Sequence, residues 1–286
     1  MEDYFNAVAA TTNGFSKKKI EIKTIKPSTN ENTDIYEIKK PHVNNLIDED
    51  NSASSSIATS TNETVKKIEL IGQNIRKEVV QIHLGIEANK INFIDHSSGH
   101  IFYSFLSSSK LKKALAISVD AFGDFLNYKA IVLKKHKNKL ISKNVTKGSN
   151  FIIARLYRYV TLILGLKPNE HEYKVMGMAP YSKEIYYKKI LSKFLNLQDV
   201  RDLKFKNLSK YKDLYFHIKK LLDGQRFDAI SGGLQAYTEN LMNKWVKNLL
   251  KKTKIYDLCL SGGVAMNVKN NLCLSEIPNV KNVFVP

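Results

Sequence analysis

The sequence of 286 residues has few of the features that build cross-linked, cysteine-rich or membrane-spanning proteins. Its two cysteines, Cys259 and Cys273, lie in apolar surroundings without the short spacing of a zinc site, so we expect no disulfide framework. A reduced cytoplasm is the simplest location for such a chain. The longest apolar stretch, 156–166, is too short to span a bilayer and contains Arg158, so we expect no membrane segment. No signal peptide is recognisable at the start of the sequence.

Acidic residues and arginine are also scarce. The chain has 27 Asp and Glu against 45 Lys and Arg, which gives a net charge of +18, and only five of the basic residues are arginines. A basic balance usually points to nucleic acid or an anionic membrane as a partner. Guanidinium is the usual group for paired contacts to phosphates and bases, however, and the lysines are spread along the whole chain. We therefore interpret the charge as a solvated lysine surface and expect no nucleic-acid partner.

The chain divides into two parts by composition. Residues 1–62 include a lysine-rich polar stretch and a run of Ser, Asp and Asn with few side chains able to form a core, which predicts a poorly ordered or variable segment. From Glu63 to His83, apolar residues recur every three to four positions and predict an amphipathic helix. Residues 63–286 have the apolar content of a globular α/β domain.

Alternating and apolar segments predict strands at 90–95, 115–119, 128–134 and 139–145, the last three as a hairpin or meander. Residues 150–164 predict a helix that ends at Gly165. A second, longer helix should carry an inward apolar stripe, which we interpret as core. Its members are Ile230, Leu234, Tyr237, Leu241, Trp245 and Leu249.

The first candidate site is a pair of histidines four residues apart, His96 and His100, expected on the first turns of a helix that follows the strand at 90–95. Side chains at this spacing lie one above the other, so both imidazoles can point to one metal ion. Asp120 follows a buried strand at the start of a glycine-containing turn and is a third candidate ligand. Two histidines and one carboxylate suit iron, zinc or manganese. The histidine spacing can also be incidental, and Asp120 can equally be a turn or capping residue.

Two further segments are candidate site elements. The stretch 167–182 is rich in Glu, Lys, Tyr, Met and Gly, and it is either a loop-like site wall or a short buried helix at 173–178. At 256–267 an apolar strand runs into Ser261, Gly262 and Gly263, with a helix expected from Val264. Such a turn can present backbone amides to phosphate, although many α/β proteins have one without this role. Asn267, one turn into that helix, could reach the same ligand or hydrogen-bond the adjacent loop.

Read in order, four motifs resemble the O-carbamoyltransferases of the nodulation-protein and antibiotic-tailoring type, over about residues 63–286. The motifs are Asp95-His-x-x-x-His100, Ser118-Val-Asp120 with Gly123-Asp-Phe125, Glu172-Tyr-Lys-Val-Met-Gly-Met-Ala-Pro-Tyr181, and Leu260-Ser-Gly-Gly-Val-Ala-Met-Asn267. The ten-residue block from Glu172 to Tyr181 is the most specific of them.

The resemblance implies an α/β, actin-like and sugar-kinase-like ATPase (ribonuclease-H-like) fold, of which this chain is a part. It implies a biosynthetic enzyme that transfers a carbamoyl group from carbamoyl phosphate, through carbamoyl-adenylate made with ATP, to a hydroxyl of a small molecule or sugar. His96, His100 and Asp120 would bind Fe²⁺, or Zn²⁺ or Mn²⁺. Ser261, Gly262, Gly263 and Asn267 would bind the nucleotide.

Further expectations come from the same family. Glu172 and Lys174 would border the acyl-transfer site as catalytic residues. The family usually has His-His-x-x-His, where Ser97 stands here, and its N-terminal phosphate-contacting strand pair is not recognisable before residue 63. After Pro286 the family continues into a turn with a fourth ligand and an adenylate-forming domain, which we expect to be absent here or present in another chain.

Two other functions remain open from the sequence. A transferase that places threonylcarbamoyl on transfer RNA shares the implied fold and the paired histidines, but should lack the block at 172–181. An inactive fragment that binds nucleotide or nothing is the non-enzymatic alternative.

Overall fold

The computed structural model describes residues 72–137 and 139–286. The prediction for residues 1–62 and the first part of the amphipathic helix predicted from Glu63 lie outside these residues. Helical backbone is present at 72–84, which confirms the described part of that helix. Among the described residues, no helix combines the length and apolar character needed to cross a bilayer.

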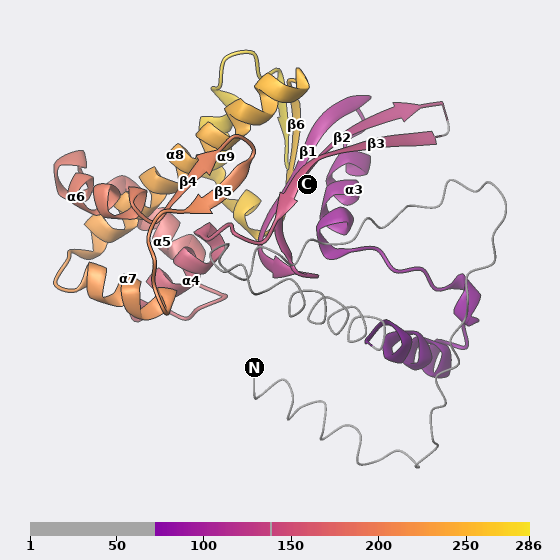
Figure 1. Cartoon of the computed structure of the whole chain (residues 1–286), viewed down its shortest axis with the longest axis horizontal. Coiled ribbons are helices and arrows are strands. Elements are labelled where there is room, and N and C mark those ends of the chain that lie inside the picture. Colours follow the sequence, from indigo (N-terminus) through magenta and orange to yellow (C-terminus); the bar gives the residue numbers. More distant parts are fainter. Residues whose placement is uncertain (1–71, 138) are drawn as a thin grey trace, which may run out of the picture. The chain divides into compact units, whose positions relative to one another are not determined.

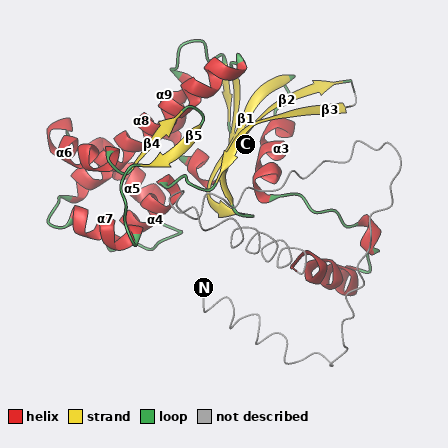
Figure 2. Cartoon of the chain, viewed as in Figure 1, coloured by secondary structure: helices red, strands yellow, loops and turns green. Residues whose placement is uncertain are grey.

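A five-stranded mixed sheet forms the centre of the described body (Figure 2). Its strands are β1 (Lys113–Gly123), β2 (Leu126–His136), β3 (Lys139–Gly148), β6 (Asp257–Ser261) and β7 (Asn282–Phe284). Their order across the sheet is β3-β2-β1-β6-β7. The first three strands form an antiparallel meander, as predicted, whereas β6 is parallel to β1 and β7 is parallel to β6. The chain is therefore a mixed α/β protein.

One α-helix directly precedes β1, and those that follow lie between β3 and β6 and between β6 and β7. The α-helices are α3 (His96–Ser107), α4 (Ile153–Ile163), α5 (Glu172–Met178), α6 (Glu184–Leu195), α7 (Leu214–Leu222), α8 (Phe227–Thr253) and α9 (Val268–Ser275). Short 3₁₀ turns are η2 (Ala88–Lys90), η3 (Ala179–Tyr181) and η4 (Gly263–Met266), and β4 (Gln198–Arg201) pairs with β5 (Lys204–Asn207) in a small separate sheet.

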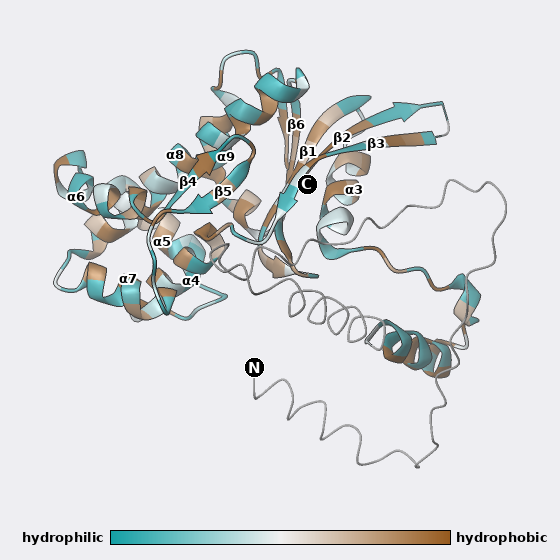
Figure 3. Ribbon diagram, in the orientation of Figure 1, coloured by the Kyte–Doolittle hydropathy of each residue, from teal (hydrophilic) through white to brown (hydrophobic). Residues whose placement is uncertain are grey.

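The two faces of the central sheet are covered by different helices (Figure 1). On one face, Ala116 of β1 packs in a cluster with Ile101 and Phe105 of α3. On the other face, Ile117 and Val119 belong to the larger core that contains α4 and α8. Alternate side chains of a strand point to opposite faces, so one apolar strand can serve both layers. Figure 3 shows hydrophobic residues in the central strands β1 and β6.

Helix α8 supplies the inward stripe that the sequence predicts. All six predicted stripe residues are buried: Ile230, Leu234, Tyr237, Leu241, Trp245 and Leu249. The indole of Trp245 lies against the rings of Tyr128 and Phe205, and its Nε1 donates to the carbonyl oxygen of Leu203 at 2.9 Å. Helix α4 ends just before Gly165, whose φ is +74°, as predicted. Cys259 is buried and Cys273 partly buried, and both are free thiols.

Two expectations for the segments around the histidines were wrong. Residues 91–95 are not a strand, because they pair with no described strand and lead directly into α3. Strand β1 does not end at Val119 but continues to Gly123, with an irregularity in its pairing to β2 between Val119 and Gly123. Asp120 therefore lies within a β-bulge, a feature that re-aims side chains next to sites, and not in the turn after the strand.

The stretch 167–182 contains the short helix that the sequence left as one of two alternatives. Helix α5 covers Glu172–Met178, and Val175 is its one buried residue. Met176 and Met178 are partly buried against the same core, Ala179 after the helix is buried, and Tyr173 and Tyr181 are exposed.

Candidate metal centre

Helix α3 begins at His96 because Asp95 caps it. The carboxylate Oδ1 of Asp95 accepts the backbone N–H of Ser98 at 2.9 Å, which satisfies one of the amides that a helix start leaves free. His96 and His100 consequently occupy the first two turns of α3 on one face, as the sequence predicts. This cap fixes where α3 begins, and with it the place of both imidazoles on the helix.

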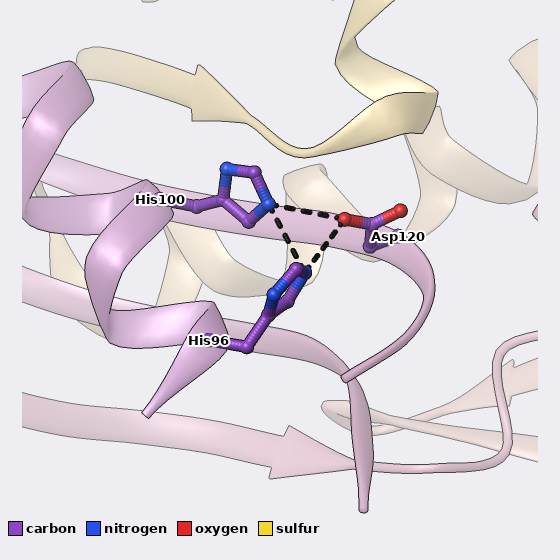
Figure 4. A group of neighbouring side chains, drawn as sticks. All are labelled: His96, His100 and Asp120. Carbon is purple, nitrogen blue, oxygen red and sulfur yellow. Dashed lines mark hydrogen bonds and ion pairs between the residues drawn. The ribbon is translucent and has the colours of Figure 1, made fainter. Parts of the chain in front are cut away.

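Two imidazole nitrogen atoms and one carboxylate oxygen atom converge between α3 and β1 (Figure 4). The Nε2 atom of His96 lies 3.0 Å from Oδ2 of Asp120, and Nε2 of His100 lies 3.1 Å from the same oxygen. The two Nε2 atoms are 3.1 Å apart. The bulge in β1 places the Asp120 carboxylate opposite the first turns of α3, so the structure brings together the three residues that the sequence selected.

The donor set fits a divalent transition metal. Ligand atoms bound about 2.1 Å from a metal at right angles to one another lie roughly 3.0 Å apart, close to the three separations observed here. The side chains of His96, His100 and Asp120 are 42%, 35% and 21% exposed. One side of the triad is thus open, which leaves room for further ligands such as water or substrate. Two histidines and a carboxylate on one face are typical of iron(II) sites.

The environment keeps the Asp120 carboxyl in its charged form. Burial alone would raise its pKa, but the hydrogen bonds from His96 and from the backbone N–H of Ala121, with the charge of both histidines, hold the pKa below its usual value. An ionised carboxylate is the form that binds metal.

Two residues of the β1–β2 turn, Gly123 and Asp124, support His96. A Cβ atom at Gly123 would overlap the imidazole of His96, so glycine leaves the space that the ring occupies. The neighbouring Asp124, at φ +47°, accepts the backbone N–H of His96 through Oδ2 at 2.7 Å. The sequence signal was the Gly-Asp pair in the β1–β2 turn, which indicates a tight turn but does not show what packs against it.

The glycine turn after β6 lies directly against the triad. Gly262 adopts φ +85° and ψ +169°, a conformation essentially restricted to glycine, and a Cβ there would overlap the carbonyl group of Val119. A Cβ at Gly263 would lie 3.1 Å from Oδ1 of Asp120. The hydroxyl of Ser261 donates to the carbonyl oxygen of Ile117 at 2.9 Å, which joins the turn to β1.

The helix expected from Val264 begins later than predicted. Residues Gly263–Met266 form the 3₁₀ turn η4, and α9 starts at Val268 with Asn267 as its cap. The reason is local, because Oδ1 of Asn267 accepts the N–H of Asn270 at 2.9 Å and thereby starts a new helix.

Asn267 is held in a buried polar network. Its Nδ2 donates to Tyr157 Oη at 3.1 Å and to Gln235 Oε1 at 2.9 Å, and Tyr157 Oη donates to Gln235 Oε1 at 2.6 Å. Asn267 is 7% exposed. The partners of Asn267 thus lie on α4 and α8 and not in the adjacent loop that the sequence offered as an alternative. Binding of nucleotide by Ser261, Gly262, Gly263 and Asn267 stays a prediction.

Replacing Tyr157 by phenylalanine is expected to lower the free energy of unfolding by about 1–3 kcal/mol, because the buried amides of Asn267 and Gln235 lose a partner. Urea denaturation measures the loss. Tyr159→Phe on the same helix is the control, since the hydroxyl of Tyr159 takes no part in this network. Equal effects of both substitutions would show that the network adds nothing to stability.

The structure keeps Glu172 and Lys174 within their own segment. Glu172 Oε1 accepts the backbone N–H of Asn169 at 2.6 Å, and Lys174 Nζ lies 3.1 Å from Nε2 of His171. In residues 72–137 and 139–286, no hydrogen bond or ion pair joins either side chain to the histidine–aspartate triad. Their assignment to the acyl-transfer site stays a prediction.

Comparison with known proteins gives a consistent result. The family model described as "Carbamoyltransferase N-terminus" matches residues 6–286, a match that begins earlier than the motifs at 95–267. An uncharacterized protein of Methanocaldococcus jannaschii is 33% identical over 195 residues, covering 65% of this chain and 36% of that protein.

Two nodulation proteins are also similar. NolO of Bradyrhizobium diazoefficiens is 25% identical over 183 residues, covering 62% of this chain and 32% of that protein. NolNO of Sinorhizobium fredii is 24% identical over 204 residues, covering 70% of this chain and 29% of that protein. The chain thus spans about a third of the length of these relatives.

Proposed function

Because the chain belongs to the carbamoyltransferase family, whose N-terminal model matches residues 6–286, we propose that it forms the metal-bearing transfer part of an O-carbamoyltransferase. Carbamoyl phosphate would be hydrolysed to carbamate and phosphate, and carbamate would react with ATP to give carbamoyl-adenylate and pyrophosphate. A hydroxyl of a small molecule or sugar would then attack the carbamoyl carbon, lose its proton and displace AMP. The observation that carries this proposal is the convergence of His96, His100 and Asp120 beside Gly263.

The proposal includes the arrangement of domains and the fold. Residues 63–286 would be part of an actin-like ATPase domain, and the adenylate-forming domain would lie outside this sequence. A sheet with an antiparallel meander on one side of β1 and the parallel strands β6 and β7 on the other supports this assignment.

The chemistry of the triad suits carbamoyl transfer. Attack by a hydroxyl on the carbamoyl carbon passes through a tetrahedral oxyanion, and donors placed where that charge develops lower the barrier. A divalent metal, when bound, would supply Lewis-acid stabilisation of this charge. His96, His100 and Asp120 would hold the metal, and Fe²⁺ is the ion that this donor set favours in our proposal, with Zn²⁺ or Mn²⁺ as alternatives.

The glycine turn would position the nucleotide next to this triad. Gly263 presents no side chain toward Asp120, so a phosphate or adenylate could approach both the turn and the open side of the triad. The first N–H groups of a helical turn have no partner within the turn, and they are suited to anionic oxygen.

A reconstitution assay tests the proposal. The metal-loaded chain, given ATP and labelled carbamoyl phosphate, should release no pyrophosphate by itself. Addition of an adenylate-forming domain from a full-length relative should allow transfer of the label to members of a panel of sugars and other hydroxyl compounds. Pyrophosphate release by the chain alone would contradict the proposed division of labour. If none of the acceptors becomes labelled, the proposal of carbamoyl transfer is contradicted.

Gly263→Val serves as the matched variant in this assay. The added side chain would fill the space beside Asp120, and it should abolish both ATP binding, measured by calorimetry, and transfer. Gly72→Val is the control, because a Cβ at Gly72 meets only the end of the Arg76 side chain, at 3.8 Å, and this position lies outside the four motifs. Unchanged ATP binding by Gly263→Val would remove the turn from the nucleotide site.

A further inference from the structure

Lys129 of β2 is a buried cation under the first turn of α3. The residue is 7% exposed, and its Nζ atom lies 3.2 and 3.1 Å from the two carboxylate oxygens of Asp95 and 2.6 Å from the hydroxyl oxygen of Ser98. An ammonium group has three donors, so these acceptors can use its whole hydrogen-bonding capacity. A buried charge requires such partners, because an unpaired one is very costly.

These contacts connect α3, which carries both histidines, to β2, the neighbour of the strand that carries Asp120. Asp95 directly precedes His96, and Ser98 lies between His96 and His100 in α3. In the sheet, Lys129 is the register partner of Ser118 in β1, two residues before Asp120. The ammonium group of Lys129 therefore ties the histidine-bearing end of α3 to the sheet, two residues along β1 from Asp120.

We propose that Lys129 is a positioning residue for the metal ligands, which sets the distance of His96 and His100 from Asp120 through Asp95 and Ser98. This inference rests on the proposed metal site. Lys129 does not contact the triad itself; it acts through the cap and first turn of α3.

The arrangement around Lys129 is not explained by stability alone. Lys147 of β3 is its register partner, and two like charges directly opposite each other on adjacent strands are unfavourable. Burial lowers the pKa of Lys147 and the charge of Lys129 lowers it further, whereas the charge of Asp95 raises it. A buried ion pair is often no more stabilising than well-packed apolar residues. What the Lys129–Asp95 pair adds is a defined geometry at the start of α3.

A second lysine on the same strand provides a matched control. Lys135 of β2 donates from Nζ to the carbonyl oxygen of Ser108 at 3.0 Å, and Nζ lies 5.1 Å from the centre of the Phe105 ring. Ser108 follows the last residue of α3. Lys129 and Lys135 thus connect β2 to opposite ends of the same helix, and only the Lys129 end carries the histidines.

The test is a Co²⁺ titration of the full chain, followed by visible absorption, for wild type, Lys129→Met and Lys135→Met. Lys129→Met should weaken Co²⁺ binding about 10- to 100-fold, the usual cost of losing a residue that orients metal ligands, and should alter the cobalt spectrum. Lys135→Met should keep the wild-type affinity and spectrum even if its melting temperature falls. Wild-type affinity in Lys129→Met, or the same loss in Lys135→Met, would overturn the inference.

A double variant covers the case in which Lys129→Met fails to fold because Asp95 is left buried without a partner. Asp95→Asn combined with Lys129→Met removes both charges, and asparagine keeps the helix cap. It should regain stability but retain the weakened Co²⁺ binding; wild-type affinity here would also overturn the inference. If wild type itself binds no Co²⁺, the proposed metal site fails, and with it the role of Lys129. If only the positioning role is wrong, wild type still binds Co²⁺ and Lys129→Met binds it with the same affinity.

Discussion

His100→Ala is expected to abolish tight binding of a divalent transition metal by this chain. The substitution leaves one imidazole and one carboxylate, His96 and Asp120, which rarely hold such an ion without further ligands. The loss of affinity should exceed about 100-fold, the upper end of what removal of a merely supporting residue costs. Elemental analysis of the purified protein and a Co²⁺ titration measure it.

His100 is the better ligand to replace, because His96 also packs against Gly123 and bonds Asp124. The His100 side chain is 35% exposed, so the metal-free variant should melt close to metal-free wild type. Added metal should raise the melting temperature of wild type only. His136→Ala, at an exposed histidine outside the triad, should retain wild-type binding. Equal metal content in wild type and His100→Ala would place any bound metal elsewhere.

Gly262→Ala is expected to lower the free energy of unfolding by about 2–6 kcal/mol. The backbone conformation at φ +85° and ψ +169° costs a residue other than glycine about 1–3 kcal/mol. The overlap of the new methyl group with Val119 costs about 1–3 kcal/mol more. Because Val119 precedes Asp120, the displaced strand should also weaken Co²⁺ binding. Urea denaturation and the Co²⁺ titration measure the two effects.

Gly165→Ala separates the two costs. Gly165 also has a positive φ, +74°, but a Cβ there would meet no atom within 4 Å. Its substitution should cost only the backbone strain, about 1–2 kcal/mol, and leave Co²⁺ binding unchanged. If Gly262→Ala were no more destabilising than Gly165→Ala, the close approach of the turn to β1 would be of no consequence.

The sequence predicted those elements whose pattern is local and repetitive. The stripe on α8 and the meander β1–β3 follow from spacing and alternation, which depend on neighbouring residues alone. The strand predicted at 90–95 was wrong because alternation indicates an extended backbone but cannot supply a partner strand. The helix predicted from Val264 was misplaced because the side chain of Asn267 caps a new helix, and capping depends on side-chain geometry.

The sequence by itself determined the candidate ligands and the family, since His96, His100, Asp120 and the glycine turn are recognisable as residue types at a spacing. Only the tertiary structure decided that they meet. His100 and Asp120 approach because α3 packs on β1 and because a bulge re-aims Asp120, and Gly263 joins them because β6 lies parallel to β1. Lys129, which connects these elements, has no sequence signal. A lysine in a strand shows its role only when burial and a distant carboxylate are seen together.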